Sequence, residues 1–240
     1  MSLIDFRPTK IFINNKKNPI RVKLELLLHS DFDFHGEKSN LFTHTNHAFP
    51  AKYPPQLPSL FIQNLTMPHD IVLDPMMGSG TTLLEASLLE RIPVGFDIDP
   101  LAANISYSKI FPFSKKILES ECTKIIENAK NNLQQKEFIE GQLNIRFSTK
   151  TKEFIDYWFS KEVQKELIAL SMAIESIEII NIRKYLFNIL SAIIITKSGG
   201  VSLARDLAHT RPHKVNKLSD KSPILEFQKR LKINIAATSN

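Results

Sequence analysis

The stretch Ile71-Val-Leu-Asp-Pro-Met-Met-Gly-Ser-Gly-Thr-Thr82 decides the fold of this 240-residue chain. Its apolar beginning predicts a short strand that ends at Asp74, and the run from Thr81 to Leu89 predicts a helix. Gly78 and Gly80 lie in the turn between them, where residues without a Cβ permit a sharp bend and a close approach to a ligand. Because the helix then presents free N–H groups to the turn, the stretch is typical of a nucleotide site. A tight strand-helix connection without a ligand has the same glycine pattern, so the neighbouring sequence is needed to distinguish it from a nucleotide site.

A second apolar run, Pro93 to Phe96, predicts a parallel strand that ends at Asp97. Asp97 follows Asp74 by 23 residues. This spacing fits one strand-helix-strand crossover, and a carboxylate at this place in such folds binds the ribose hydroxyls of a nucleotide cofactor. The sequence therefore predicts that Asp97 binds a ribose.

Two other interpretations of these residues are disfavoured. A phosphate-binding loop needs a lysine after its glycines, but Gly80 is followed by Thr81, so the pattern does not indicate an ATPase. Asp99 and Pro100 match the N-cap and the first position of another helix, so Asp99 is expected to be structural.

These segments resemble the cofactor half of S-adenosylmethionine-dependent DNA methyltransferases that modify the exocyclic amino group of adenine (N6) or cytosine (N4). The resemblance rests on Asp-Pro-Met-Met-Gly-Ser-Gly-Thr-Thr at 74–82 and Gly-Phe-Asp-Ile-Asp-Pro at 95–100. The upstream run His47 to Pro55 resembles the segment that closes over the methionine end of the cofactor in that family. The stretch from Thr196 to His213 is similar, less specifically, to a polar stretch before the catalytic motif of some members.

The resemblance implies an α/β, Rossmann-like methyltransferase fold, here incomplete and with a helical insertion, and S-adenosyl-L-methionine as the cofactor. In such a site, Asp74 and the backbone of 78–82 would hold the amino-acid part of the cofactor. Lys52 would contact its carboxylate, although an ordinary surface lysine fits the sequence equally well. The cofactor-binding residues that the resemblance implies are Pro50, Lys52, Tyr53, Asp74, Pro75, Met76, Gly78, Ser79, Gly80, Thr81, Thr82, Asp97 and Ile98.

The sequence departs from this family at the acceptor loop. Members hold the target amino group with Asp, Asn or Ser followed by Pro-Pro and an aromatic residue, and the 240 residues contain no such tetrapeptide. Tyr53-Pro-Pro-Gln56 differs at both ends. We therefore assign no catalytic residue to this sequence.

The missing loop leaves several functions open. We expect the cofactor-binding part of a restriction-modification methyltransferase that acts on duplex DNA, with its target base flipped out of the helix. A second protein chain would then carry the acceptor loop, and a truncated gene product explains the missing loop equally well. The alternatives are an RNA methyltransferase of the same fold and a catalytically inactive, regulatory module that binds the cofactor.

Pattern and charge divide the chain into four expected regions. These are an N-terminal segment at 1–40 with β-like runs at Ile11–Ile13 and Arg21–Leu24, a cofactor-binding α/β unit at 41–110, a helical region at 111–198, and a basic segment at 199–240. The helical region either helps to hold DNA or packs on the cofactor unit. From Lys197 to Lys232, nine Lys and Arg residues accompany three acids, and this excess of six equals that of the whole chain. Such a segment fits a nucleic-acid partner or a solvated surface tail.

Cysteine and histidine are too sparse to indicate a disulfide or a metal site. The single Cys122 follows Glu121 rather than the proline that precedes the nucleophile of cytosine carbon-5 methylation, so that mechanism is disfavoured. In Asp31–His35, acids alternate with aromatic residues as in a half-buried edge, without a second group of ligands at metal-site spacing. No apolar run reaches the roughly 18 residues of a membrane span. We expect a cytoplasmic protein without metal or membrane contact.

Overall fold

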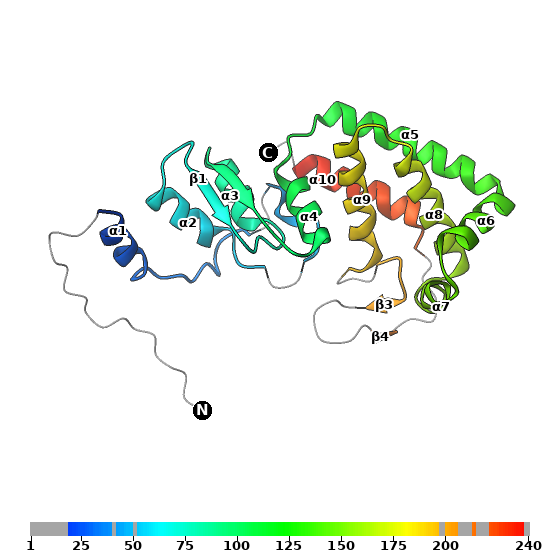
Figure 1. Ribbon diagram of the computed structural model, residues 1–240, viewed down its shortest axis with the longest axis horizontal. Helices are drawn as coiled ribbons and strands as arrows, with labels where there is room; N and C mark the ends of the chain where they lie inside the picture. The colour runs from blue at the N-terminus through cyan, green and yellow to red at the C-terminus, as the bar shows by residue number, and fades with distance from the viewer. Residues whose placement is uncertain are drawn as a thin grey trace.

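The structure is a computed structural model that describes residues 19–39, 42–49, 52–196, 200–205, 213–214 and 221–237. Most of these residues are helical, and a small α/β unit lies at one end of a larger group of helices (Figure 1). In chain order the elements are α1 (Pro19–Leu27), the 3₁₀ helix η1 (Phe42–Thr45), α2 (Gln56–Leu65), β1 (Ile71–Asp74), α3 (Thr81–Leu88), β2 (Ile92–Gly95), α4 (Pro100–Ile110), α5 (Lys115–Gln134), α6 (Lys136–Arg146), α7 (Thr149–Trp158), α8 (Lys161–Glu175), α9 (Ile180–Ile194), β3 (Ala204–Arg205), β4 (His213–Lys214) and α10 (Pro223–Ala237).

The α/β unit is a single parallel strand pair with its crossover helix. β1 and β2 pair from Ile71 opposite Ile92 to Asp74 opposite Gly95, and α3 packs against both strands. This confirms the predicted order of strand, glycine turn, helix and parallel strand. β2 ends at Gly95, two residues before the predicted end at Asp97. The carboxylate of Asp97 instead accepts a hydrogen bond from the glycine turn. The pair is consistent with an incomplete Rossmann-like fold, of which the described residues form two parallel strands.

The remaining helices form a separate core around α8. α5 lies along α8, and α10 packs against α5, α8 and α9 (Figure 1). The largest fully buried side chains of this core include Leu170, Leu186, Phe227 and Leu231. The last two come from α10, which lies in the segment that was expected to be basic. A solvated tail therefore does not describe α10, whose apolar side chains recur at helical spacing and are buried while its lysines face outward.

The N-terminal part of the structure corrects one prediction. Arg21–Leu24, interpreted as a β-like run, lies within α1. A helix brings Arg21 Nε within 3.2 Å of Glu25 Oε1 and buries Leu27, and α1 packs against α2. The run from Arg21 to Leu24 was too short to separate strand from helix, whereas the Arg21–Glu25 pair, four residues apart, supports the helix. The other β-like run, Ile11–Ile13, lies outside the described residues.

α4 and η1 connect the α/β unit to the helical core. α4 packs against α3 on one side and α9 on the other. The amide of Asn188 in α9 donates to the backbone oxygen of Asn104 at 2.7 Å and also bonds Ser108. η1 contacts α3, α4 and α10. Among the helices described, none is long and apolar enough to cross a membrane.

Candidate cofactor site

The glycine turn requires both of its glycines for different reasons. Gly78 and Gly80 have φ of +49° and +74°, in the left-handed region that side chains disfavour. The N–H of Gly80 donates to the oxygen of Met77 at 2.7 Å and closes the turn. A Cβ on Gly80 would also lie 2.7 to 2.9 Å from three atoms of Ser106. The close approach of α4 to the turn therefore depends on Gly80 having no side chain.

Asp97 connects the end of β2 to this turn. Its Oδ2 accepts from the N–H of Gly78 at 2.8 Å, and its Oδ1 accepts from the N–H of Asp99 at 2.9 Å. These two N–H donors, Asp99 first, lower the pKa of the Asp97 carboxyl. Each carboxylate oxygen accepts about two hydrogen bonds, so acceptor capacity remains for a ligand hydroxyl. The hydroxyl of Ser106 holds the turn from the other side by donating to the oxygen of Gly78 at 2.8 Å.

Asp99 caps the next helix, as predicted. Its side chain accepts from the N–H of Leu101 at 2.8 Å, and Pro100 occupies the first turn of α4. The two acids at the end of β2 thus differ in their contacts: Asp97 bonds the glycine turn, and Asp99 bonds α4.

Tyr53 and Asp74 both lie near the start of α3. The hydroxyls of Tyr53 and Thr82 form a hydrogen bond, and burial raises the pKa of Tyr53. Asp74 accepts from the N–H of Met76 at 3.1 Å. The structure thus brings the segment before α2 together with the helix that follows the glycine turn, as the resemblance implies.

Lys52 is directed toward backbone oxygens. Its Nζ donates to the oxygens of His47 at 2.6 Å and His44 at 3.1 Å, and burial, followed by the charge of Arg230, lowers its pKa. It also lines a pocket of about 510 Å³. Lys52 is thus an exposed residue whose ammonium bonds two backbone oxygens, and its contact with a cofactor carboxylate stays a prediction. Pro50, from the same segment, lies outside the described residues.

The pocket next to Lys52 joins both parts of the protein. Its lining residues are Ser39, His44, Thr45, His47, Ala48, Lys52, Tyr53, Pro54, Pro55, Thr81, Ala192, Thr196 and Arg230. Thr81 begins α3, Ala192 lies in α9 and Arg230 in α10. Arg230 could not be predicted as a lining residue of this pocket, because it is one of several basic residues in its stretch and no local motif distinguishes it. The contact of Arg230 with the backbone oxygen of Thr45, 185 positions earlier, distinguishes it only in the folded protein.

The other residues of the predicted set lie around the turn in different environments. Ser79 and Thr81 are buried beneath it, whereas Met76 and Ile98 are among the most exposed apolar side chains of the protein. Neither Asp97 nor Ile98 lines the pocket next to Lys52. The predicted residues thus form two groups, one at the strand ends and one at the pocket, which meet at the glycine turn and the start of α3.

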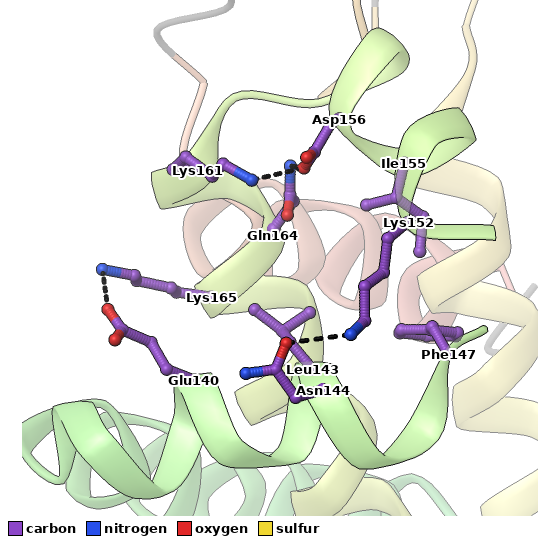
Figure 2. Close-up of a pocket in the computed structure, with 10 residues that line it drawn as sticks. All are labelled: Glu140, Leu143, Asn144, Phe147, Lys152, Ile155, Asp156, Lys161, Gln164 and Lys165. Atoms are coloured by element: carbon purple, nitrogen blue, oxygen red, sulfur yellow. Dashed lines mark hydrogen bonds and ion pairs between the residues drawn. The ribbon is translucent and has the colours of Figure 1, made fainter. Parts of the chain in front are cut away.

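A second pocket lies far from this turn, between α6, α7 and α8 (Figure 2). It has a volume of about 290 Å³. Its charged side chains are paired with one another: Lys161 with Asp156, Lys165 with Glu140 at 3.0 Å, and Lys152 with the side-chain oxygen of Asn144 at 3.0 Å. Because these charges already have partners, we assign no function to this pocket.

A glycine turn at the carboxyl ends of two parallel strands, bonded to an acid 19 residues further on, is an arrangement typical of units that bind nucleotide cofactors. The comparisons with known proteins specify the class further. Residues 10–109 match the family model described as DNA methylase. This match confirms the resemblance to DNA methyltransferases that modify exocyclic amino groups.

Curated relatives support the same relationship. The chain is 30% identical to the type II methyltransferase M.MjaII of Methanocaldococcus jannaschii, over 57% of this chain and 26% of the relative. It is 28% identical to the type II methyltransferase M.MvaI of Kocuria varians, over 63% of this chain and 34% of the relative. Identity with the type II methyltransferase M.PvuII of Proteus hauseri is 38%, over 31% and 25% of the two chains. The match spans only about a quarter to a third of these relatives. No solved structure matches.

Proposed function

We propose that this chain supplies the S-adenosylmethionine-binding part of a DNA methyltransferase that modifies an exocyclic amino group, N4 of cytosine or N6 of adenine. The observation that carries the proposal is the glycine turn that Asp97 and Ser106 hold at the carboxyl ends of β1 and β2. The match of residues 10–109 to the DNA methylase model supports the same function.

The side chains around the turn fit the chemical groups of this cofactor. The open lone pairs of Asp97 suit the two ribose hydroxyls. Met76, Phe96 and Ile98 are exposed apolar side chains beside Asp97 and suit the faces of an adenine ring. The pocket with Lys52, Tyr53 and Thr81 offers a cation and two hydroxyls to an amino-acid group. The missing Cβ of Gly80 keeps the turn close to α4.

The chemistry needs little from the protein beyond position. S-adenosylmethionine supplies a methyl group on a sulfonium, which is already activated for transfer to a nitrogen. The task of Asp97, the glycine turn and the segment at Lys52 is to fix the cofactor in one orientation, and such orientation is a large share of the catalysis of a two-substrate reaction. No acid or base of this chain is assigned to the step.

The acceptor half would come from a second protein chain. Within the part of the chain that the structure describes, β1 and β2 leave an apolar face uncovered, with Ile71 68%, Leu73 57% and Ile92 50% exposed. Parallel sheets are normally covered on both faces, and sheets of fewer than three strands are marginal. A partner that carries the Asp/Asn/Ser-Pro-Pro-aromatic loop would cover this face and complete the site.

Titration calorimetry with S-adenosylhomocysteine tests the proposal directly. We expect saturable binding by the purified chain, and added duplex DNA is expected to bind only when the partner is present. A chain that binds no S-adenosylhomocysteine would overturn the proposal. Preference of the complex for structured RNA over duplex DNA would instead favour an RNA methyltransferase, and cofactor binding without methyl transfer in any complex would favour a regulatory module.

A further inference from the structure

Four basic side chains gather where η1, α4 and α10 meet. They are His47 after η1, Lys52 before α2, Lys109 in the last turn of α4 and Arg230 in α10. The charges of the other three all lower the pKa of His47, in addition to the larger effect of its burial. Lys52 in turn lowers the pKa of Lys109, and Arg230 that of Lys52. Like charges in such proximity destabilise one another unless an anion lies between them.

The backbone satisfies part of this cluster. Lys52 donates to the oxygens of His44 and His47, and Arg230 donates through Nη2 to that of Thr45. These carbonyl oxygens carry partial charges and hold the η1 segment in place, but they do not neutralise a full cation. The Nε of Arg230 is buried, and no described group accepts a hydrogen bond from it.

Lys109 is the most isolated member. Its side chain is 3% exposed, and its Nζ has no hydrogen-bond partner within the described part of the chain. Burial, followed by the charge of Lys52, lowers its pKa to about 7. The buried acid of this region is Glu85 of α3, and its carboxylate bonds Nε2 of His44 at 2.7 Å. An ammonium buried without a partner costs stability, so its presence calls for a reason.

His47 does not supply a fourth full charge. Its Nδ1 lies 2.6 Å from the oxygen of Ala48, to which only an N–H can donate. Its Nε2 lies 3.2 Å from Oγ of Ser191, which can donate to an unprotonated nitrogen. These partners suit a neutral ring, in agreement with the lowered pKa of His47. Lys52 and Arg230 therefore remain as cations, together with Lys109, whose pKa of about 7 leaves it partly protonated at neutral pH.

The cluster borders an open space of suitable size. His47, Lys52 and Arg230 all line the pocket of about 510 Å³ that also contains Thr81, the first residue of α3. Lys109 is not a lining residue, but its charge reaches His47 at the wall. The pocket thus combines room for a small ligand, hydroxyl groups, and positive charge that no described acid balances.

We infer that this pocket is an anion-binding site in which Lys52 and Arg230 contact a carboxylate or phosphate group of a small ligand, while the charge of Lys109 behind the wall adds to the attraction. The nearness of Thr81 makes the amino-acid carboxylate of S-adenosylmethionine one source, and this source rests on the proposed function. A free phosphate-type anion is the other. In either case α10, from the helical core, contributes Arg230 to the ligand site of the α/β unit.

The substitution Lys109→Met separates a binding role from a structural one. Methionine has nearly the same length without the charge, so we expect the ligand-free protein to melt at a higher temperature than the parent. Its affinity for the anion should fall about tenfold, the value of a lost charge interaction of ordinary strength. Arg230→Gln should weaken binding by a similar factor. Lys229→Gln removes a charge from the exposed side of the same helix and should change neither property.

Three probes distinguish the sources of the anion: S-adenosylhomocysteine, 5′-methylthioadenosine, which lacks the carboxylate, and inorganic phosphate. If S-adenosylhomocysteine binds more tightly than 5′-methylthioadenosine, and this difference is lost in Lys109→Met and Arg230→Gln, the anion is the cofactor carboxylate. Phosphate binding that depends on the same two residues, without binding of S-adenosylhomocysteine, retains the anion site and rejects the proposed function. The inference is overturned if neither substitution weakens either S-adenosylhomocysteine or phosphate, and the proposed function then still stands on binding of the cofactor.

Discussion

At the scale of single residues, Asp97 shows how one carboxylate can serve both the fold and a ligand. Each of its oxygens already accepts a backbone N–H, one from the glycine turn and one from the start of α4. The bonds fix the orientation of the carboxylate before a ligand arrives, and pre-organisation of this kind reduces the cost of ordering on binding. The same bonds make Asp97 part of the structure of the turn.

Asp97→Ala is therefore expected to weaken binding of S-adenosylhomocysteine roughly ten- to a hundredfold, because hydrogen bonds to a charged group are lost. The melting temperature of the ligand-free variant should also fall, since Gly78 loses its acceptor. Asp99→Ala is the matched control: loss of the N-cap costs about 1 kcal/mol of stability, with affinity retained. Calorimetry that finds equal affinities for the parent and Asp97→Ala would refute the ribose assignment.

Lys109 gives the ligand-free protein a measurable dependence on pH. Its pKa is about 7 in the folded protein, against an ordinary value of 10.5. Between these values the unfolded chain binds more protons at this group, so stability rises with pH across this window. We expect Lys109→Met to lose that rise, measured as the difference in free energy of unfolding between pH 7 and pH 9. If the free energy of unfolding changes with pH in Lys109→Met as it does in the parent, the pKa of Lys109 is not lowered in the folded protein.

The residues of the turn could be predicted from the sequence, whereas the cation cluster could not. Gly78, Gly80 and Asp97 belong to one crossover, and local order suffices to bring them together. Lys109 and Arg230 are separated by 121 positions and meet only because α4 and α10 both pack near η1. No spacing rule connects such positions, so their proximity required the tertiary structure.

At the scale of elements, local sequence signals explain why the strand-turn-helix unit could be predicted so closely. β1, α3 and β2 each carry their own signal: an apolar run, a glycine pair, a helix-forming run. The helix α10 also carries such a signal, in Ile224, Phe227, Leu231 and Ile235, but its basic residues Lys229, Arg230 and Lys232 left a solvated surface tail open as an interpretation. Charge alone could not decide between these interpretations, since an amphipathic helix has both a charged face and an apolar face.

Gly80→Ala tests the contact between α3 and α4. A side chain there requires a left-handed φ and lies within 2.9 Å of Ser106, so we expect a loss of about 1–3 kcal/mol in the free energy of unfolding. Gly141→Ala, in α6, meets no atom within 4 Å and should stabilise the protein by about 0.5–1 kcal/mol. Urea denaturation of both variants decides the matter. A neutral Gly80→Ala would mean that the turn can move away from α4.

At the scale of the whole molecule, the two parts are covered unequally. The helical core contains α5, α8, α9 and α10, while α3 packs against the strand pair (Figure 1). Within the described residues, apolar side chains of the strand pair such as Ile71 and Leu73 are exposed. Exposed apolar faces of this kind mark interaction sites or promote aggregation. The molecule therefore has an enclosed helical part that carries α10 and Arg230, and a strand pair that would be open to the proposed partner.

The purified chain is accordingly expected to bind the cofactor but to transfer no methyl group to DNA, and a second chain with the Pro-Pro-aromatic loop should restore transfer. Leu73→Lys, on the open face of β1, should abolish the complex while leaving binding of S-adenosylhomocysteine intact, because Leu73 points away from α3. Ile145→Lys places the same charge on an exposed apolar position of α6 and should leave the complex intact. Co-purification and transfer of labelled methyl groups measure both effects. Methyl transfer by the chain alone would show that its 240 residues contain an acceptor site of a different kind. Gly78→Arg is the control, because a charged side chain at the glycine turn should block cofactor binding without changing the sheet. The observed transfer should be lost in this variant.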